Sequence, residues 1–184
     1  MAIKRILKYP QDEAELRKKS EPVAQVDDEI KALIQDLKDT LAAEGGAGLA
    51  AAQIGVHKRV ALVVFGQDEG EMKPPLAIIN PQIIKSGPLA EGFDGCLSIP
   101  DLMTWSTPRP AHLVFTALDE NGKKIRMKVK GIDARVVDHE IDHLEGVLYL
   151  DKLTDMNELY TTQINEEGKS VAVPVHKVIK KKQG

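Results

Sequence analysis

The segment His139-Glu140-Ile141-Asp142-His143 carries the residue types of a metal site that activates water. On an α-helix, positions i and i+4 lie on one face about one turn apart, so both imidazole rings can reach the same point. Two neutral imidazoles beside a carboxylate are the groups that bind a divalent ion and activate water. A match of this length also arises by chance. Other parts of the chain therefore have to support a metal site.

A metal held by two histidines needs a further protein ligand, and Cys96 is the candidate. It is the only cysteine of the chain, so it is either a buried small hydrophobe or a working thiolate. Gly95 before it permits a backbone geometry that could expose the thiol. The segment from Gly46 to Gln53 is rich in small residues that allow another chain to approach closely, and it ends in an amide donor. Taken alone, that segment is more typical of a tight turn.

The elements that would position these residues begin with a helix. Acidic residues at positions 27–29 are typical of a helix start, because they cap free amides and suit the positive end of the helix dipole. Gly45 and Gly46 end the pattern. Between them, apolar residues at helical spacing form one stripe: Ile30, Leu33, Ile34, Leu37 and Leu41.

Strand signals follow this helix. Apolar runs at residues 60–65 and 76–84 are separated by a polar loop, and Asn121-Gly122 predicts a hairpin turn between strands at 113–118 and 125–129. In the second of these strands, alternation predicts Ile125, Met127 and Val129 on one side and Arg126, Lys128 and Lys130 on the other. We expect Asp133 to cap a second helix, which carries the two histidines and ends at Gly146.

This order of elements predicts an α+β fold, with antiparallel or mixed sheets packed around a central helix that carries the His-Glu-x-x-His motif. The length of 184 residues favours a single catalytic domain over residues 1–184. Residues 151–184 are interpreted as a C-terminal extension with a turn near 165–168 and a short strand at 170–175. Its basic end, Lys177 and Lys180 to Lys182, is interpreted as a solvated tail.

Composition excludes several classes. The formal net charge of −3 provides no global basic surface, so DNA is not expected as a partner. No apolar run approaches the roughly 18 residues of a membrane span, and the start of the chain lacks the apolar core of a secretion signal. A single cysteine cannot form an internal disulfide. We therefore expect a cytoplasmic protein.

Together, the three segments resemble the peptide deformylases. That family carries Gly-x-Gly-apolar-Ala-Ala-x-Gln, then Glu-Gly-Cys-apolar-Ser, then a Gln-His-Glu segment that leads to a second histidine. The corresponding segments here occur in the same order and are Gly46 to Gln53, Asp94 to Ser98 and Asp138 to Leu144. The similarity runs from Leu7 to Leu150, so residues 1–150 correspond to the deformylase core.

The resemblance implies one divalent metal ion bound by Cys96, His139 and His143, with its fourth position left for water. The metal would lower the pKa of that water and make it the nucleophile. A thiolate ligand partly neutralises the charge of the ion, and the family commonly uses ferrous iron. We therefore expect Fe(II), with Zn(II), Ni(II) or Co(II) as substitutes.

The resemblance also implies the reaction. The substrate would be a nascent polypeptide that begins with formyl-methionine, and the products would be formate and a free amine. Glu140 would act as general base and then as general acid. The side-chain amide of Gln53 and the backbone N–H of Leu97 would stabilise the oxyanion. Gly48 would form backbone hydrogen bonds with the peptide, which lies like an added strand.

Three further positions match residues that touch the methionine side chain in the family: Ala47, Ile132 and Val136. Their size and apolarity suit an unbranched thioether, although ordinary core packing explains each of them equally well. We expect a monomer with at most a transient contact with the ribosome, and no membrane contact.

Two residues depart from the family motifs. Asp94 stands where the family has Glu, and Asp138 where it usually has Gln. We predict an Asp94–Arg109 ion pair that braces the cysteine loop, against the alternative of a weak surface pair. We interpret Asp138 as a solvated helix residue rather than as an acceptor for a ligand imidazole.

Two other functions remain open at this point. A zinc endopeptidase also uses His-Glu-x-x-His, but Cys96 and the lack of a later ligand motif argue against it. A degenerate relative that holds a structural metal is conceivable because of Asp94 and Asp138. The presence of Glu140 and Gln53 favours the enzyme.

Overall fold

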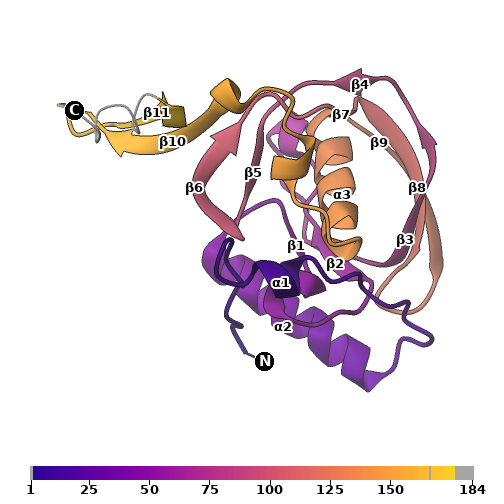
Figure 1. Cartoon of the computed structure of the whole chain (residues 1–184). Helices are drawn as coiled ribbons and strands as arrows, with labels where there is room; N and C mark the ends of the chain where they lie inside the picture. The colour runs from indigo at the N-terminus through magenta and orange to yellow at the C-terminus, as the bar shows by residue number, and fades with distance from the viewer. Residues whose placement is uncertain (1, 166, 177–184) are drawn as a thin grey trace.

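The structure, a computed structural model, describes residues 2–165 and 167–176. Two long helices lie on opposite sides of a five-stranded sheet, and a four-stranded sheet covers the other side of the second helix (Figure 1). The long helices are α2 (Asp28–Glu44) and α3 (Gly131–Leu144), and α1 is a short turn of helix (Glu13–Leu16). This arrangement confirms the expected α+β fold with a central helix that carries the histidine motif.

The sheets are antiparallel throughout their paired strands. The five-stranded sheet has the order β1 (Gly48–Ala50), β2 (Val60–Val63), β3 (Leu76–Ser86), β8 (His112–Leu118) and β9 (Lys124–Lys130). The four-stranded sheet has the order β11 (Ser170–Pro174), β10 (Leu159–Ile164), β6 (Ile99–Thr104) and β5 (Asp94–Cys96). A small ribbon pairs β4 (Leu89–Ala90) with β7 (Arg109–Pro110). Short 3-10 helices complete the chain: η1 (Ala51–Ile54), η2 (Gln67–Glu69), η3 (Tyr149–Lys152) and η4 (Met156–Glu158).

The core explains why strand β2 is apolar at every position. Leu62 and its alternate neighbours pack with α2, whereas Ala61 and Val63 face the opposite side and pack with α3. A strand that is buried on both faces needs apolar residues at successive positions rather than at alternate ones. The sheet therefore separates two apolar clusters: α2 packs in one of them, and α3 packs in the other.

Helix α2 forms as its sequence predicts. Asp27 accepts a hydrogen bond from the backbone N–H of Ile30 at 3.0 Å, which satisfies one free donor of the first turn. The apolar stripe faces the sheet, and Gly45 follows the helix with a φ of 78°. The predicted start, stripe and end of this helix are confirmed.

Helix α3 begins at Gly131, before the residue predicted to cap it. The prediction that Asp133 is the N-cap is wrong, because Asp133 lies in the first turn and the N-cap is Lys130. The Asp133 carboxylate instead accepts hydrogen bonds from the backbone N–H groups of Gly66, at 3.1 and 3.2 Å, and of Gln67, at 3.4 Å. It therefore ties the loop after β2 to the start of α3. Gly146 follows the helix with a φ of 74°, as expected.

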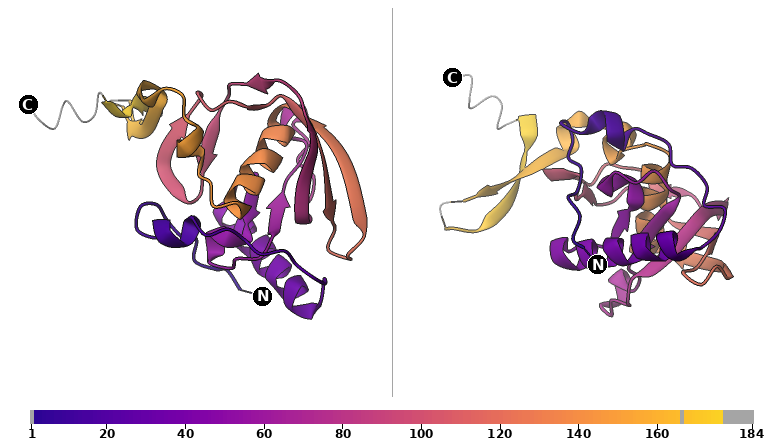
Figure 2. Two further views of the ribbon diagram at one scale, coloured as in Figure 1. Left: turned by 45° about the vertical axis from the view of Figure 1, so that its right-hand side comes forward. Right: turned by 90° about the horizontal axis from the view of Figure 1, so that it is seen from below.

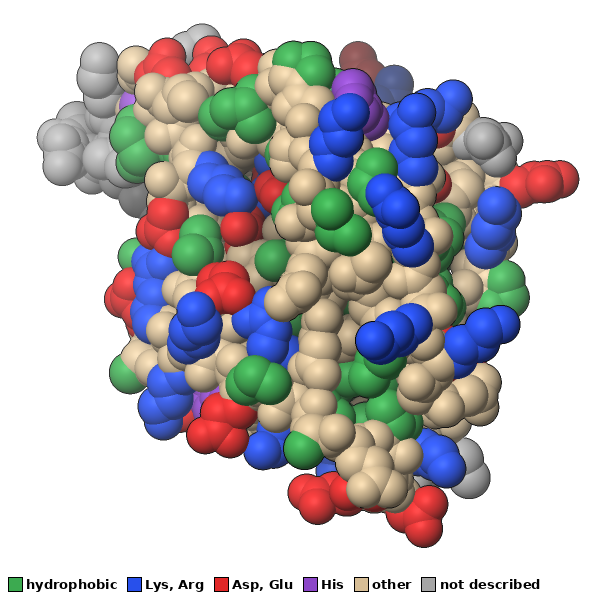
Figure 3. All heavy atoms as spheres, turned by 90° about the vertical axis from the view of Figure 1, so that its right-hand side faces the viewer, with side chains coloured by type: hydrophobic (Ala, Val, Ile, Leu, Met, Phe, Trp, Pro, Cys, Tyr) green, Lys and Arg blue, Asp and Glu red, His purple; other side chains and the backbone are tan. Residues whose placement is uncertain are grey.

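The β8–β9 hairpin is present as predicted. Asp119 accepts hydrogen bonds from the backbone N–H groups of Asn121 and Lys123, both at 2.9 Å, which stabilise the turn. The alternate residues of β9 are exposed, and Lys and Arg side chains gather on this face of the molecule (Figure 3): Lys124, Arg126, Lys128 and Lys130. Because β9 is an edge strand, this charge discourages pairing with another chain.

The C-terminal extension forms a hairpin of β10 and β11, which projects from the rest of the molecule (Figures 1 and 2). Asn165 accepts hydrogen bonds from the backbone N–H groups of Glu167, at 3.1 Å, and Lys169, at 2.8 Å, within the turn. The predicted turn and strand are therefore present. The basic residues at 177 and 180–182 lie outside the described residues. None of the helices in the described part of the chain is long and apolar enough to cross a membrane.

Candidate metal centre

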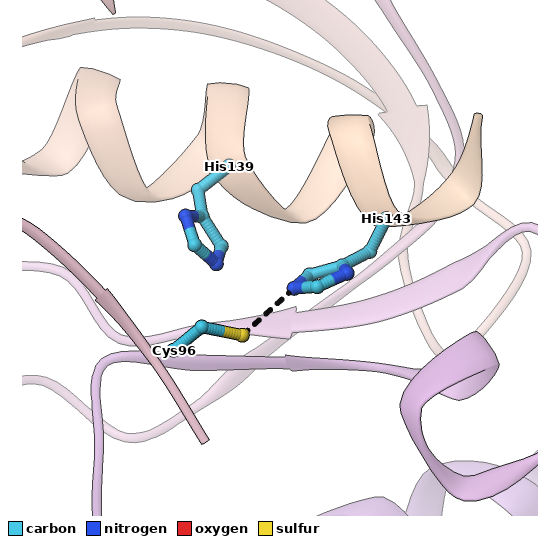
Figure 4. Close-up of side chains that lie close together, drawn as sticks. All are labelled: Cys96, His139 and His143. Atoms are coloured by element: carbon cyan, nitrogen blue, oxygen red, sulfur yellow. Dashed lines mark hydrogen bonds between the residues drawn. The ribbon is translucent and has the colours of Figure 1, made fainter. Parts of the chain in front are cut away.

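Two separate elements bring Cys96, His139 and His143 together. The cysteine ends strand β5, and both histidines project from one face of α3 toward its sulfur (Figure 4). One ligand atom from each residue lies within 4.8 Å of the other two. The Cys96 Sγ is 3.1 Å from His143 Nε2. The three residues expected to hold a metal thus converge on one point.

The ring of His139 is oriented by a carboxylate. Its Nδ1 lies 2.7 Å from Asp94 Oδ1, and a carboxylate can only accept at this contact. The Nδ1 proton is therefore held by Asp94, and Nε2 is the nitrogen that faces Cys96. Burial opposes a positive charge on His139, but Asp94 and Cys96 outweigh it and raise its pKa well above the ordinary value.

The sulfur of Cys96 is surrounded by hydrogen-bond donors. Gln53 Nε2 and the backbone N–H of Ser98 each lie 3.4 Å from it. Burial opposes ionisation of the thiol, but His143 and His139 outweigh burial and lower its pKa well below the usual range. A thiolate facing two imidazole nitrogens is the donor set that a divalent transition ion prefers, so the residues fit such an ion.

Arg109 links the site to the interior. It is 1% exposed, and its Nε donates to Asp94 Oδ2 at 2.6 Å. Its Nη1 donates to Asp138 Oδ2 at 2.6 Å and to Asp142 Oδ2 at 2.7 Å. The predicted Asp94–Arg109 ion pair is confirmed, and it is buried rather than a surface pair. Burial disfavours ionised Asp94, but His139 and Arg109 prevail and lower the pKa of Asp94 below its usual range.

The interpretation of Asp138 as a solvated residue is wrong. It is 7% exposed and accepts hydrogen bonds from Arg109 and, at 3.1 Å, from Lys152 Nζ. Lys152 also pairs with Asp142 at 2.6 Å. Asp138 therefore supplies a charge that the buried Arg109 needs, because an unpaired guanidinium would be costly to bury. The chain has no local signal for this pairing, since Lys152 comes from a different element.

Glu140 lies beside the cluster in a buried position. It is 4% exposed, and its Oε2 has no hydrogen-bond partner among the described residues. Burial raises the pKa of Glu140 to about 7. A side chain at Gly48 would collide with this carboxylate, so glycine is required there for the two elements to meet.

Gln53 is fixed at the same place. Its Oε1 accepts from the backbone N–H of Ala50 at 2.8 Å, and its Nε2 donates to Ser98 Oγ at 3.1 Å as well as to the sulfur. Leu97 follows Cys96, and its carbonyl accepts from Lys8 Nζ at 2.6 Å. Both residues line the cavity, so the sequence-predicted donors of the site lie at its wall. Ser98 and Lys8 were not predicted.

A cavity of about 600 Å³ opens beside the cluster. Strands β1 and β5, each at the edge of its sheet, both contribute residues to it. The apolar residues expected in the side-chain pocket all line this cavity: Ala47, Ile132 and Val136. Arg135 lines it too, and this residue was not predicted, because the helical pattern alone does not indicate where its long side chain ends.

A thiolate, two imidazoles and a buried carboxylate beside an open cavity define a metal-dependent hydrolase. The family described as Polypeptide deformylase matches residues 3–159. The chain belongs to this family.

Known proteins agree with this assignment. A peptide deformylase of Thermomicrobium roseum is 40% identical over 172 residues, which cover 91% of this chain and 95% of the relative. Peptide deformylase 2 of Prochlorococcus marinus is 41% identical over 155 residues, which cover 83% of this chain and 75% of the relative. These relatives confirm the enzyme class that the sequence predicted.

Solved structures show the same fold. A peptide deformylase from Ehrlichia chaffeensis in complex with actinonin has a TM-score of 0.78 and 32% identity, with all of both chains covered. One from Legionella pneumophila has a TM-score of 0.75 and 36% identity, and covers 84% of this chain and 88% of its own. The fold of this chain is therefore that of solved peptide deformylases.

Proposed function

We propose that this chain removes the formyl group from the N-terminal formyl-methionine of nascent polypeptides and releases formate. The convergence of Cys96, His139 and His143 beside the buried carboxylate of Glu140 carries this proposal. An open cavity lined by two strand edges provides the place for an extended peptide.

Cys96, His139 and His143 would hold one divalent ion. We infer Fe(II), with Zn(II), Ni(II) or Co(II) as substitutes, because the thiolate partly neutralises the charge of the ion and would make zinc a weaker Lewis acid here than in a site of neutral ligands. When bound, the ion supplies Lewis acidity, which activates water and polarises the formyl carbonyl. Asp94 fixes the tautomer of His139, so the ring can offer only Nε2.

Glu140 moves the proton. It takes a proton from the attacking water as the oxygen bonds to the formyl carbon, and later delivers it to the amine nitrogen as the carbon–nitrogen bond breaks. A pKa of about 7, raised by burial, suits a group that must act as base and then as acid near neutral pH. The products are then formate and a peptide with a free N-terminus.

The tetrahedral oxyanion needs donors that are already in place. The side chain of Gln53 is held at the cavity wall, because its Oε1 accepts from the backbone N–H of Ala50 and its Nε2 donates to Ser98 Oγ and to the sulfur of Cys96. We propose that this amide and the backbone N–H of Leu97 donate to the oxyanion. The bond from Ala50 to Oε1 keeps the amide in place, so that the N–H now directed at the sulfur can turn to the oxyanion while the bond to Ser98 stays.

The peptide would lie between the edges of β1 and β5. Gly48 of β1 would form backbone hydrogen bonds with it, and the absence of a side chain there lets the peptide approach Glu140. The methionine side chain would enter the part of the cavity lined by Ala47, Ile132 and Val136. We further propose a cytoplasmic monomer, organised as one catalytic domain, that contacts the ribosome only transiently and binds no DNA.

The test is formate release from formyl-Met-Ala-Ser by anaerobically purified protein, with metal analysis of the same sample. We expect turnover by the wild type, and none by the Glu140→Gln variant at unchanged metal content. An internal peptide without a formyl group should remain intact, which separates this activity from that of an endopeptidase. Retained turnover in Glu140→Gln would refute the proposed base.

A further inference from the structure

The cavity contains a charged residue that the proposed reaction does not use. Arg135 lies on α3, one turn after Ile132 and next to Val136, and all three line the cavity. The other two belong to the proposed methionine pocket and are apolar. A basic residue thus belongs to the apolar wall that would receive the first side chain of the peptide.

The Arg135 side chain is held in place. Its Nη1 donates to the carbonyl of Thr107 at 3.0 Å and its hydroxyl at 3.3 Å, and its Nη2 donates to the carbonyl of Ala90 at 2.8 Å. Only 14% of the side chain is exposed. A Cβ at Gly92 would lie 2.8 Å from Nη2, so this glycine leaves room for the guanidinium. The guanidinium is therefore fixed on the protein beside the cavity wall instead of swinging into solvent.

The charge of Arg135 is poorly balanced within the protein. The nearest carboxylate oxygen, Asp94 Oδ2, lies 4.0 Å away. That oxygen already accepts from Arg109 Nε at 2.6 Å and from Thr107 Oγ1 at 3.1 Å. Burial lowers the pKa of Arg135, but arginine remains protonated in proteins. A buried cation with a distant counter-ion attracts any further acceptor that enters the cavity.

We propose that Arg135 is a specificity-determining residue, which makes the pocket accept first side chains that end in a hydrogen-bond acceptor, including methionine sulfoxide as well as methionine. The inference rests on the proposed deformylation and names its substrate class more closely. The sulfoxide oxygen is a strong acceptor on a side chain as long as methionine. A purely apolar pocket would reject it, because its polar group would be buried without a partner.

Norleucine provides the matched comparison, since it has the length of methionine without an acceptor. We expect wild-type kcat/KM for formyl-Met-sulfoxide-Ala-Ser to equal or exceed that for formyl-norleucyl-Ala-Ser. In Arg135→Met, the ratio of the two should fall about tenfold, the effect of one hydrogen bond to a charged donor. Arg126→Met, which removes an exposed arginine of β9, should leave the ratio unchanged.

Binding provides a readout that does not depend on turnover. Calorimetric titration of both peptides into Glu140→Gln, with and without Arg135→Met, should show the same change in the ratio of dissociation constants. Arg135→Lys keeps the charge and should therefore keep the preference for the sulfoxide peptide over the norleucine peptide. This variant provides the test if Arg135→Met does not fold. A wild type that favours the norleucine peptide more than about tenfold, or an unchanged ratio in Arg135→Met, would overturn the proposal.

The two proposals fail separately. If the wild type releases no formate from formyl-Met-Ala-Ser, deformylation is wrong, and the binding ratio alone decides the role of Arg135. If that peptide is hydrolysed but the sulfoxide peptide is neither bound nor turned over, the role of Arg135 is wrong and deformylation stands.

Discussion

The two histidines of α3 lie one turn apart, yet their surroundings differ. The Nδ1 of His139 contacts the carboxylate of Asp94, which in turn accepts a hydrogen bond from the fully buried Arg109. The Nδ1 of His143 is buried as well, but it has no hydrogen-bond partner among the described residues. One ring is therefore oriented by a chain of charges, and the other by packing and by its contact with the sulfur of Cys96.

This difference assigns unequal tasks to two residues of the same type. The Asp94 carboxylate fixes the tautomer of His139 and increases the electron density on its Nε2. A metal bond to Nε2 is therefore strengthened. His143 has no such carboxylate among the described residues, and its Nε2 lies 3.1 Å from the sulfur of Cys96. We expect both histidines to be needed for the metal, and only His139 to be sensitive to its polar surroundings.

The largest expected effect concerns metal binding, to which both histidine rings contribute. Replacing either His139 or His143 by Ala should abolish metal retention after dialysis and reduce kcat/KM by at least about a thousandfold, because two ligands cannot hold the ion. Metal analysis and formate release measure these losses. The control is Arg126→Met, which removes an exposed arginine of β9, because the partly buried His57 pairs with Glu15 at 3.1 Å and is not a suitable position. Full metal content in either histidine variant would show that the replaced histidine is not a metal ligand.

The next effect concerns the support behind His139. Arg109→Met leaves the buried Asp94 and Asp138 and the partly buried Asp142 without their shared cation, and should lower the free energy of unfolding by about 3–5 kcal/mol. Urea unfolding of the protein measures this change. Lys152 compensates for part of the lost charge at two of these carboxylates. A loss below about 1 kcal/mol would show that the network contributes no more than a surface pair.

Asp94→Asn sharpens the contrast between the rings. It keeps the shape but weakens the acceptor for His139 Nδ1, and we expect metal affinity to fall about 10- to 100-fold. Asp94→Glu should restore most of the affinity. The matched control is Asp142→Asn, which changes another partner of Arg109 that does not contact the ring. Equal losses in Asp94→Asn and Asp142→Asn would mean that charge, not ring orientation, is what matters.

The smallest effect concerns Glu140, which lies between the two histidines in the chain. Burial raises the pKa of Glu140 in the folded protein to about 7, above the ordinary 4.5, so its contribution to stability is fully present below pH 4.5 and is lost as the pH rises through 7. Chelated Glu140→Gln should therefore gain stability relative to chelated wild type between pH 5 and pH 8, by roughly 2 kcal/mol or less. Urea unfolding at both pH values measures the gain, and a constant difference would contradict it.

Local sequence patterns were enough to predict much of the molecule. Caps, apolar spacing and the Asn121-Gly122 turn predicted α2 and the β8–β9 hairpin, because these features depend on neighbouring residues. The candidate ligands were predictable for a different reason, since Cys96 and the two histidines lie within motifs whose order and spacing resemble a family.

Contacts between distant elements were not predictable in the same way. Asp133 looked like a cap, but a loop more than sixty residues earlier in the chain provides its partners, Gly66 and Gln67. Asp138 looked solvated because nothing near it in the sequence shows that Arg109 and Lys152 meet there. The position of Arg135 in the cavity wall likewise depends on the path of its long side chain to Thr107 and Ala90.

The most direct test of the central claim is X-ray absorption at the metal edge of the anaerobically purified protein. The account predicts a coordination shell with one sulfur and two imidazole nitrogens, and loss of the sulfur contribution in Cys96→Ser. A shell without sulfur in the wild type would contradict it.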